Sequence, residues 1–181
     1  LGVAAVNGRI YTIGGMTENG PTGQLDIYHI ETGSWETGAP RPLALANVAA
    51  VVVDDKLLVP GGCDAEWRPS AVTSFYDIEK DTWFESALLP TPLCAYALTA
   101  YQGKAYLFGG LGESGYQAVA YAYDIVSGTW EPLAAPRAAR GFGAAAVLTD
   151  RIFYVGGYNG KQEQNVCEVY LPEANRWEEC M

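Results

Sequence analysis

Side chains suited to metal or redox chemistry are few in this sequence. Its single histidine is His29, so a zinc or copper site built from several imidazoles cannot form within it. Its four cysteines show neither a CxxC pair nor metal-ligand spacing: Cys63, Cys94, Cys167 and Cys180. We therefore expect no metal and no cofactor, and we expect the cysteines to be free thiols that serve as small apolar residues.

Catalytic groups are equally sparse. Neither a Ser/His/Asp set nor a Cys/His set is available, because the one histidine directly follows a repeated tyrosine in a structural position. Three acids fall in expected loops, where carboxylates are ordinarily solvated: Glu18, Glu66 and Glu113. We assign no catalytic residue and expect a non-enzymatic role, while acid–base chemistry by loop acids stays open.

The charge balance argues against nucleic acid as a partner. The chain has 11 Lys and Arg against 21 Asp and Glu, a formal net charge of −10. Phosphate backbones are held mainly by clustered basic residues, whereas here they are scattered. The longest apolar run, Val48 to Val53, is far shorter than the ~20 residues of a membrane-spanning helix. We expect neither nucleic-acid binding nor membrane insertion.

One pattern, repeated four times, organises the chain. A Gly-Gly pair recurs at intervals of 47, 48 and 47 residues, a Tyr follows each pair, and a Trp comes seven residues after each Tyr. A period near 50 residues is typical of a repeat architecture. The repeated residues are Gly14, Gly15, Tyr28 and Trp35; Gly61, Gly62, Tyr76 and Trp83; Gly109, Gly110, Tyr123 and Trp130; and Gly156, Gly157, Tyr170 and Trp177.

Each repeat is predicted to form four antiparallel strands. In the second repeat an apolar, β-branched run over 46–53 leads through Asp54-Asp55 into a strand that ends at Gly61-Gly62. A loop of roughly ten residues, a strand carrying the Tyr and a strand beginning near the Trp complete the unit. Two residues before each Trp stand types that tolerate a left-handed backbone, which predicts a turn there: Gly33, Asp81, Gly128 and Asn175.

That last hairpin bears on two of the cysteines. If Tyr170 lies opposite Trp177, the same register places Cys167 opposite Cys180. Directly opposed residues are close enough for a disulfide, so this bond is an alternative to two free thiols.

Side-chain size favours an arrangement of the four units around an axis. The first strands are rich in Ala and Val, and the fourth strands begin with Trp. A propeller blade is a wedge, narrow at the axis and wide at the rim, and this distribution fills a wedge. Gly-Gly would end the second strand where a Cβ would obstruct a neighbouring backbone.

These residues resemble the kelch repeat, a blade of the kelch β-propeller, over essentially the whole chain. The resemblance implies an all-β propeller domain over 1–181, with repeats of approximately 1–41, 42–90, 91–137 and 138–181. Kelch propellers usually have about six blades, so we expect part of a larger ring. A closed four-blade ring, or association of chains that completes a ring, stays open.

The resemblance places ligand binding on the loops after Gly-Gly and on the residues that lead into the first strands. The loops span 16–24, 63–72, 111–118 and 158–165. Aromatic and arginine side chains are the types enriched at interface hot spots. The candidate ligand-binding residues are Trp67, Arg68, Tyr116, Arg140, Phe142, Tyr158 and Asn47. Arg140 is the one residue that matches an arginine position of kelch proteins, and capping a loop carbonyl or pairing with an acid is its structural alternative.

From the family we expect a protein–protein interaction scaffold with a protein partner. The alternative is a propeller that binds or isomerises a sugar, in the manner of a mutarotase, with aromatic and acidic side chains at the channel mouth. Partner capture and a glycan array would separate the two.

Overall fold

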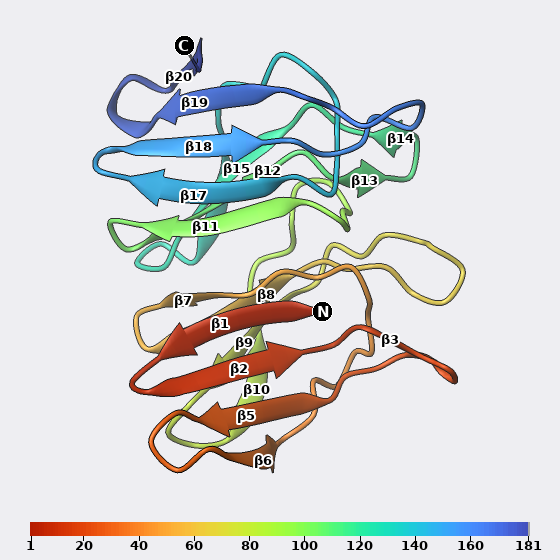
Figure 1. Ribbon diagram of the computed structural model, residues 1–181, viewed down its shortest axis with the longest axis vertical. Helices are drawn as coiled ribbons and strands as arrows, with labels where there is room; N and C mark the ends of the chain where they lie inside the picture. The colour runs from red at the N-terminus through yellow and green to blue at the C-terminus, as the bar shows by residue number, and fades with distance from the viewer. Residues whose placement is uncertain (181) are drawn as a thin grey trace.

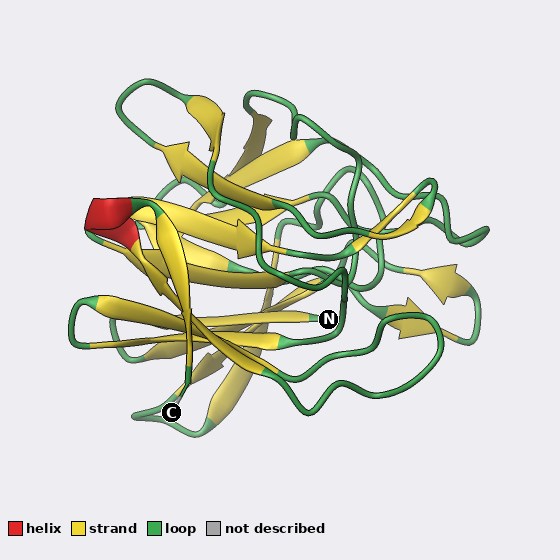
Figure 2. Ribbon diagram, turned by 90° about the horizontal axis from the view of Figure 1, so that it is seen from above, coloured by secondary structure: helices red, strands yellow, loops and turns green. Residues whose placement is uncertain are grey.

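The computed structural model describes residues 1–180 and consists almost entirely of strands and loops (Figures 1 and 2). Four sheets, here called blades 1 to 4, each hold four antiparallel strands in chain order. Blade 1 contains β1 (Gly2–Val6), β2 (Arg9–Ile13), β5 (Leu25–His29) and β6 (Ser34–Gly38). Blade 2 contains β7 (Val51–Val53), β8 (Lys56–Pro60), β9 (Thr73–Asp77) and β10 (Thr82–Glu85). Blade 3 contains β11 (Ala97–Tyr101), β12 (Lys104–Phe108), β15 (Ala120–Asp124) and β16 (Thr129–Pro132). Blade 4 contains β17 (Ala144–Leu148), β18 (Arg151–Val155), β19 (Cys167–Leu171) and β20 (Arg176–Glu179).

Three short elements decorate the blades. Two small hairpins follow the Gly-Gly pairs of blades 1 and 3: β3 (Met16–Thr17) with β4 (Gly20–Pro21), and β13 (Leu111–Gly112) with β14 (Gly115–Tyr116). One turn of 3₁₀ helix (Pro172–Ala174) joins β19 to β20.

The predicted hairpin between the third and fourth strands is confirmed in every blade. The residue two before each Trp has positive φ: 66° at Gly33, 50° at Asp81, 69° at Gly128 and 44° at Asn175. Each Tyr lies directly opposite its Trp, with ring centroids 5.1–5.2 Å apart. The four Tyr–Trp pairs therefore occupy equivalent places in successive sheets.

The first strands of the four blades form the centre of the assembly. β1 contacts β7, β7 contacts β11, and β11 contacts β17. The Gly-Gly pairs allow this packing: a Cβ on Gly61 would collide with the Leu93 carbonyl oxygen, and one on Gly109 with that of Arg140. Both glycines also have positive φ, which favours glycine over residues with a Cβ. The predicted close approach of backbones at these pairs is confirmed.

In blades 2, 3 and 4 the indole N–H donates a hydrogen bond to the preceding blade or to the segment that follows it. Trp83 Nε1 donates to the Ala39 carbonyl of blade 1 at 2.7 Å, and Trp177 Nε1 to the Ala134 carbonyl at 2.7 Å. Trp130 Nε1 donates to Thr73 Oγ1 of blade 2 at 2.9 Å. Within residues 1–180 no neighbouring blade covers Trp35, which is 60% exposed. Blades 1 and 4 lie at opposite ends of the molecule in Figure 1, so the four blades form an open arc and not a closed four-blade ring.

The expectation of free thiols is wrong for all four cysteines. Cys167 and Cys180 form a disulfide, as the register of the β19–β20 hairpin allowed. Cys63 and Cys94 form a second disulfide, with Cα atoms 5.4 Å apart. Cys63 follows Gly61-Gly62 of blade 2, and Cys94 leads into blade 3. The close approach of these two backbones, with Gly62 N donating to Leu93 O at 2.9 Å, brings the cysteines together.

Candidate functional site

Four loops and three strand-leading residues gather on one side of the arc, which we call the loop face. It consists of loops 16–24, 63–72, 111–118 and 158–165 together with Asn47, Ala95 and Phe142. The tight hairpin turns between first and second strands lie at the opposite side, as Figures 1 and 2 show. The loop face is the side on which the backbone is least regular, so it can vary without disturbing the sheets.

The residues that lead into the first strands share one unusual conformation. Asn47, Ala95 and Phe142 have φ values of 52°, 55° and 57°. Ala95 N donates to Asn47 O at 2.8 Å, and Phe142 N donates to Ala95 O at 2.6 Å. These hydrogen bonds link blades 2, 3 and 4 in one chain around the mouth of the arc. The Phe142 side chain is 49% exposed there.

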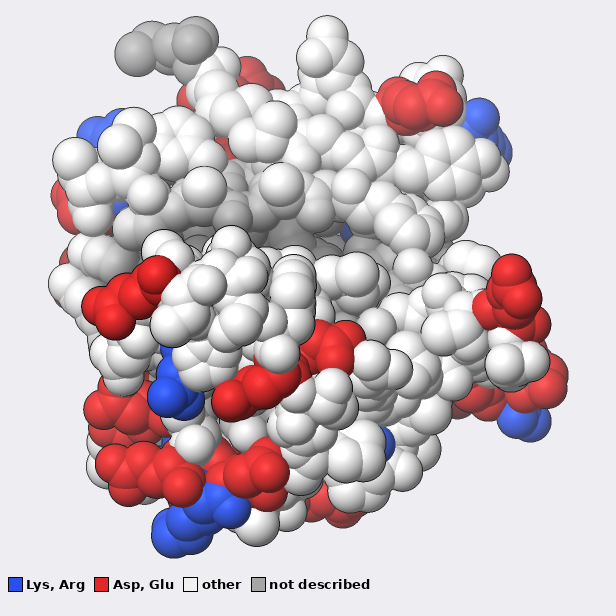
Figure 3. Space-filling view, turned by 60° about the horizontal axis from the view of Figure 1, so that its bottom comes forward, with Lys and Arg blue, Asp and Glu red and all other residues white. Residues whose placement is uncertain are grey.

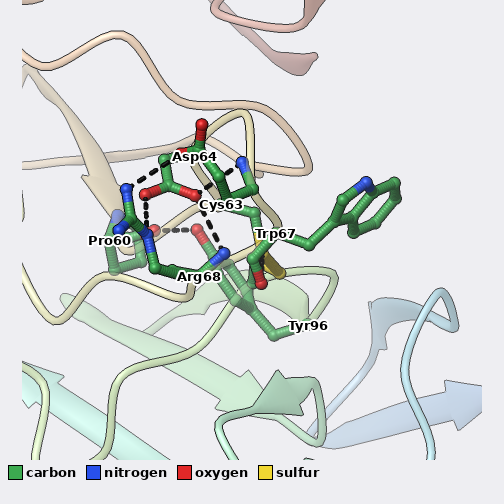
Figure 4. The surroundings of a disulfide bond; sticks show 8 residues. Pro60, Cys63, Asp64, Trp67, Arg68 and Tyr96 are labelled. Atoms are coloured by element: carbon green, nitrogen blue, oxygen red, sulfur yellow. Dashed lines mark hydrogen bonds and ion pairs between the residues drawn. A yellow bond between two sulfur atoms is a disulfide. The ribbon is translucent and has the colours of Figure 1, made fainter.

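The loop of blade 2 presents Trp67 to solvent. Trp67 also has positive φ, 62°, and its side chain is 52% exposed. Figure 4 shows the indole extending away from the rest of its loop. The loop itself is held by the Cys63–Cys94 disulfide and by the Asp64 carboxylate, which accepts hydrogen bonds from the backbone N–H groups of Glu66 and Arg68 at 3.0 and 2.9 Å.

Arg68 faces its own loop and not Trp67 (Figure 4). Its guanidinium donates to Asp64 at 2.7 Å and to Glu66 at 2.8 Å, while its side chain stays 73% exposed. The Arg68 backbone N–H and then its side chain hold the pKa of the Asp64 carboxyl below its usual range. Arg68 therefore keeps the loop in shape and leaves donors free for a ligand.

A groove separates Trp67 from the small hairpin of blade 3. Its volume is about 550 Å³. Trp67, Arg68 and Pro69 line one side, and Leu111, Glu113 and Gly115 line the other.

Beyond that hairpin, three of the predicted residues form an aromatic cluster. Tyr116 lies with its ring centroid 5.6 Å from Tyr158 and 6.4 Å from Phe142. Tyr116 is half-buried, and burial raises the pKa of its hydroxyl. We call Trp67, on the other side of the groove, and the cluster of Tyr116, Phe142 and Tyr158 the aromatic band, which runs from blade 2 to blade 4.

Arg140 lies apart from this band, inside blade 4. Its side chain is fully buried and its Nη1 donates to Glu168 at 2.5 Å. Nε donates to the Gly156 carbonyl at 3.0 Å, and the guanidinium stacks 3.7 Å from the centre of the Tyr154 ring. A ligand on the loop face cannot reach it. Asn47 is half-buried at the mouth, on the far side of Ala95 from Phe142.

A second buried arginine escaped the sequence reasoning. Arg41 is 3% exposed and donates to the carbonyls of Val59 and Gly61, both at 3.2 Å, and to Ser74 Oγ at 3.0 Å. Its position along the repeat differs from that of Arg140, so alignment of the motifs does not reveal it. A Pro-Arg-Pro sequence at 40–42 is the one local signal.

Charge and metal chemistry add no further site. Within residues 1–180, no three His, Cys, Asp or Glu side chains come together as a metal site would need. His29 Nε2 lies 3.0 Å from Glu36 on the rim of blade 1. Acidic side chains predominate on the face seen in Figure 3, and basic ones are isolated among them. The described part of the chain contains no helix of the length and apolarity needed to cross a bilayer.

The fold and its repeated contacts define a kelch-type β-propeller architecture. Comparison with solved structures agrees: "Structure of YjhT" superposes with a TM-score of 0.83 at 14% identity, over 99% of this chain and 64% of that one. The KLHDC2/KLHL20/DRC7 Kelch-repeats domain family matches residues 2–181, and the chain belongs to this family.

Curated relatives are kelch proteins of greater length. Beta-scruin of Limulus polyphemus is 26% identical over 97% of this chain and 21% of its own length. Kelch-like protein terF of Aspergillus terreus is 27% identical over 97% and 42%. Kelch-like protein 36 of Mus musculus is 25% identical over 97% and 30%. The chain spans less than half the length of these relatives.

Proposed function

We propose that this protein is an interaction scaffold that binds a segment of a partner protein across the loop face. One observation carries the proposal: two large aromatic side chains, Trp67 and Phe142, are both half-exposed and both held at positive φ. The binding surface is the aromatic band of Trp67, Tyr116, Phe142 and Tyr158 with its groove.

The backbone conformation matters because it is costly for these residue types. An αL conformation costs a residue with a Cβ on the order of 1–3 kcal/mol, and Asn or Asp tolerates it best. Asn7 and Asp54 have it in hairpin turns, where polar turn residues are expected. An exposed Trp or Phe in this conformation gains little from burial to offset the cost. Such residues fit anchors that are buried when a partner binds.

Kinship supports a protein as the partner. Kelch-repeat relatives such as Kelch-like protein 36 suggest a protein-interaction role for the family. The four loops rest on rigid sheets, and the Cys63–Cys94 disulfide fixes the Trp67 loop to blade 3. A rigid, preorganised surface lowers the entropy lost on binding.

The test is partner capture with loop-face variants that spare the fold. Trp67→Asn and Phe142→Asn introduce a residue type that tolerates positive φ at both positions, so the melting temperature of each variant should stay level or rise. Loss of a hot-spot aromatic should weaken binding by ~30-fold or more. Trp35→Asn is the matched control, because Trp35 is also exposed but lies on the free face of blade 1.

The outcome that contradicts the proposal is equally definite. A partner retained by wild type and by both loop-face variants, but lost with Trp35→Asn, places binding on the free blade face. The aromatic band also suits the stacking of a sugar ring. Binding on a glycan array without any captured protein, abolished by Tyr116→Ala, would favour the carbohydrate alternative.

A further inference from the structure

A cavity of about 400 Å³ lies at the end of β2 in blade 1. Thr12, Gly14, Gln24 and Asp26 are among the residues that line it. It is separate from the aromatic band, and nothing in the proposed function uses it. Blades 2 and 4 show what fills the same place elsewhere in this chain.

In each of those blades a buried guanidinium occupies the place. In blade 4, Arg140 donates to the carbonyls of Tyr154 and Gly156, at 3.3 and 3.0 Å, and to the Glu168 carboxylate. In blade 2, Arg41 donates to the corresponding carbonyls of Val59 and Gly61 and to the Ser74 hydroxyl. Two carbonyls and one accepting side chain thus form a fixed acceptor set for a planar, forked donor.

Blade 1 has the same acceptor set. Thr12 pairs with Asp26 across β2 and β5, as Tyr154 pairs with Glu168 across β18 and β19. Gly14 begins the Gly-Gly pair, as Gly156 does in blade 4. The acceptors in blade 1 are therefore the carbonyls of Thr12 and Gly14 and the carboxylate of Asp26.

No arginine of the described chain fills this set. Among residues 1–180, no hydrogen-bond donor reaches the Gly14 carbonyl. The Gln24 side chain donates to both Asp26 carboxylate oxygens, at 2.9 and 2.8 Å, and the Thr37 hydroxyl donates to Asp26 Oδ1 at 3.2 Å. Arg140 precedes its own blade by a few residues, and the position that corresponds to it in blade 1 falls before Leu1.

Blade 3 differs from blades 2 and 4 both in its accepting side chain and in having no arginine at this place within the described residues. Its counterpart of Asp26 is Tyr121, whose hydroxyl pairs with Thr91 Oγ1 at 2.9 Å. No guanidinium enters blade 3 within the described residues. Glu168 and Ser74 each accept a hydrogen bond from an arginine, and Tyr121 does not. Asp26 carries a carboxylate, as Glu168 does.

We propose that the blade 1 cavity is a guanidinium-binding site that takes an arginine side chain through Asp26 and the carbonyls of Thr12 and Gly14. Lysine fits less well, because a point-like ammonium cannot span the carboxylate and both carbonyls in one plane. The arginine can come from polypeptide that leads into β1 or from a peptide bound in trans.

The first experiment adds N-acetyl-arginine amide to the 181-residue chain and follows chemical shifts at Gly14 and Asp26. Binding should be saturable, and at least ~10-fold weaker for N-acetyl-lysine amide and for Asp26→Asn. Gln24→Ala removes the competing amide, so it should tighten binding. Opposite effects of these two variants distinguish a built site from general affinity for an acidic surface.

The second experiment identifies the source of the arginine. The sequence of residues 137–142, Arg-Ala-Ala-Arg-Gly-Phe, is placed directly before Leu1, with a control in which its fourth residue is Ala. An arginine supplied from the same chain is supported if the extension with Arg raises the melting temperature above that of the Ala control and also prevents binding of free N-acetyl-arginine amide. The rise in melting temperature should be lost with Asp26→Asn. Binding of the free probe with no difference between the two extensions supports a peptide in trans. No binding and no difference would overturn the proposal.

Discussion

The four Trp residues hold one position in the repeat but have different surroundings, which permits a direct test of how the blades pack. Trp130 is 8% exposed, whereas Trp35 is 60% exposed. We expect Trp130→Ala to lower the free energy of unfolding far more than Trp35→Ala does. The comparison removes residue type and local hairpin geometry as explanations.

The magnitude follows from area and hydrogen bonding. An indole side chain buries on the order of 200 Å², so the two exposures differ by roughly half of this area, ~100 Å². At about 25 cal/mol per Å² that area contributes ~2.5 kcal/mol. Trp130 also donates to Thr73, a buried residue, and an unpaired buried hydroxyl adds about 1 kcal/mol or more. The loss at Trp130 should exceed the loss at Trp35 by about 3–4 kcal/mol.

Guanidinium chloride unfolding followed by far-UV circular dichroism measures both losses without relying on tryptophan fluorescence. Equal losses at Trp35 and Trp130 would refute the open arc, because Trp35 would then have to be covered. A loss at Trp35 that grows with protein concentration would show a second copy covering the free face of blade 1.

Three further predictions follow from other contacts. Arg140→Met leaves the buried Glu168 carboxylate without its cation and should cost ~3–5 kcal/mol in calorimetry, largely recovered by adding Glu168→Leu. The exposed Arg68→Met should leave stability nearly unchanged. The double variant Cys63→Ser, Cys94→Ser removes a crosslink between residues 31 apart in the sequence and should lower the free energy of unfolding by roughly 3–4 kcal/mol. Free thiols found by mass spectrometry after alkylation of the wild type would show that the disulfide is absent. Burial raises the pKa of Tyr154 and of Tyr170 to about 12, against ~10 in an unfolded chain. The neutral hydroxyls therefore stabilise the fold fully below pH ~10, and this contribution is lost as pH rises towards ~12. Urea denaturation at a series of pH values measures this fall in the free energy of unfolding, and Tyr154→Phe should make the fall less steep. An equally steep fall in the variant would contradict the burial of this hydroxyl.

Contacts within one repeat were predictable because the same residues recur at the same spacing. The Tyr–Trp register and the left-handed residue before each Trp depend only on a local hairpin, so four copies of the pattern determined them. The register of Cys167 with Cys180 was visible for the same reason. The free-thiol expectation failed there because register shows which residues meet and says nothing of their oxidation.

Contacts between blades were not predictable in this way. Cys63 and Cys94 lie in different repeats, and each occurs once at its position, so no periodicity relates them. Arg41 reaches the same acceptors in blade 2 that Arg140 reaches in blade 4, but from a different distance along the chain. Leu45 stands at the place in the second repeat that corresponds to Arg140, and it is part of the core.

Arg41 and Arg140 show that equivalent acceptors can be reached from different places in the repeat. In blades 2 and 4 an arginine donates both to the carbonyls at the end of the second strand and to an accepting side chain on the third strand. The two arginines lie at different distances along the chain from these acceptors, so the sheet fixes the acceptors while the donor can occupy different positions in the sequence. The acceptors are therefore a better guide than the arginine itself. In blade 1 the acceptors Thr12, Gly14 and Asp26 are present beside a cavity and an exposed Trp35. Under the proposal above, an arginine bound there would complete the acceptor set of blade 1 as Arg41 and Arg140 do in blades 2 and 4.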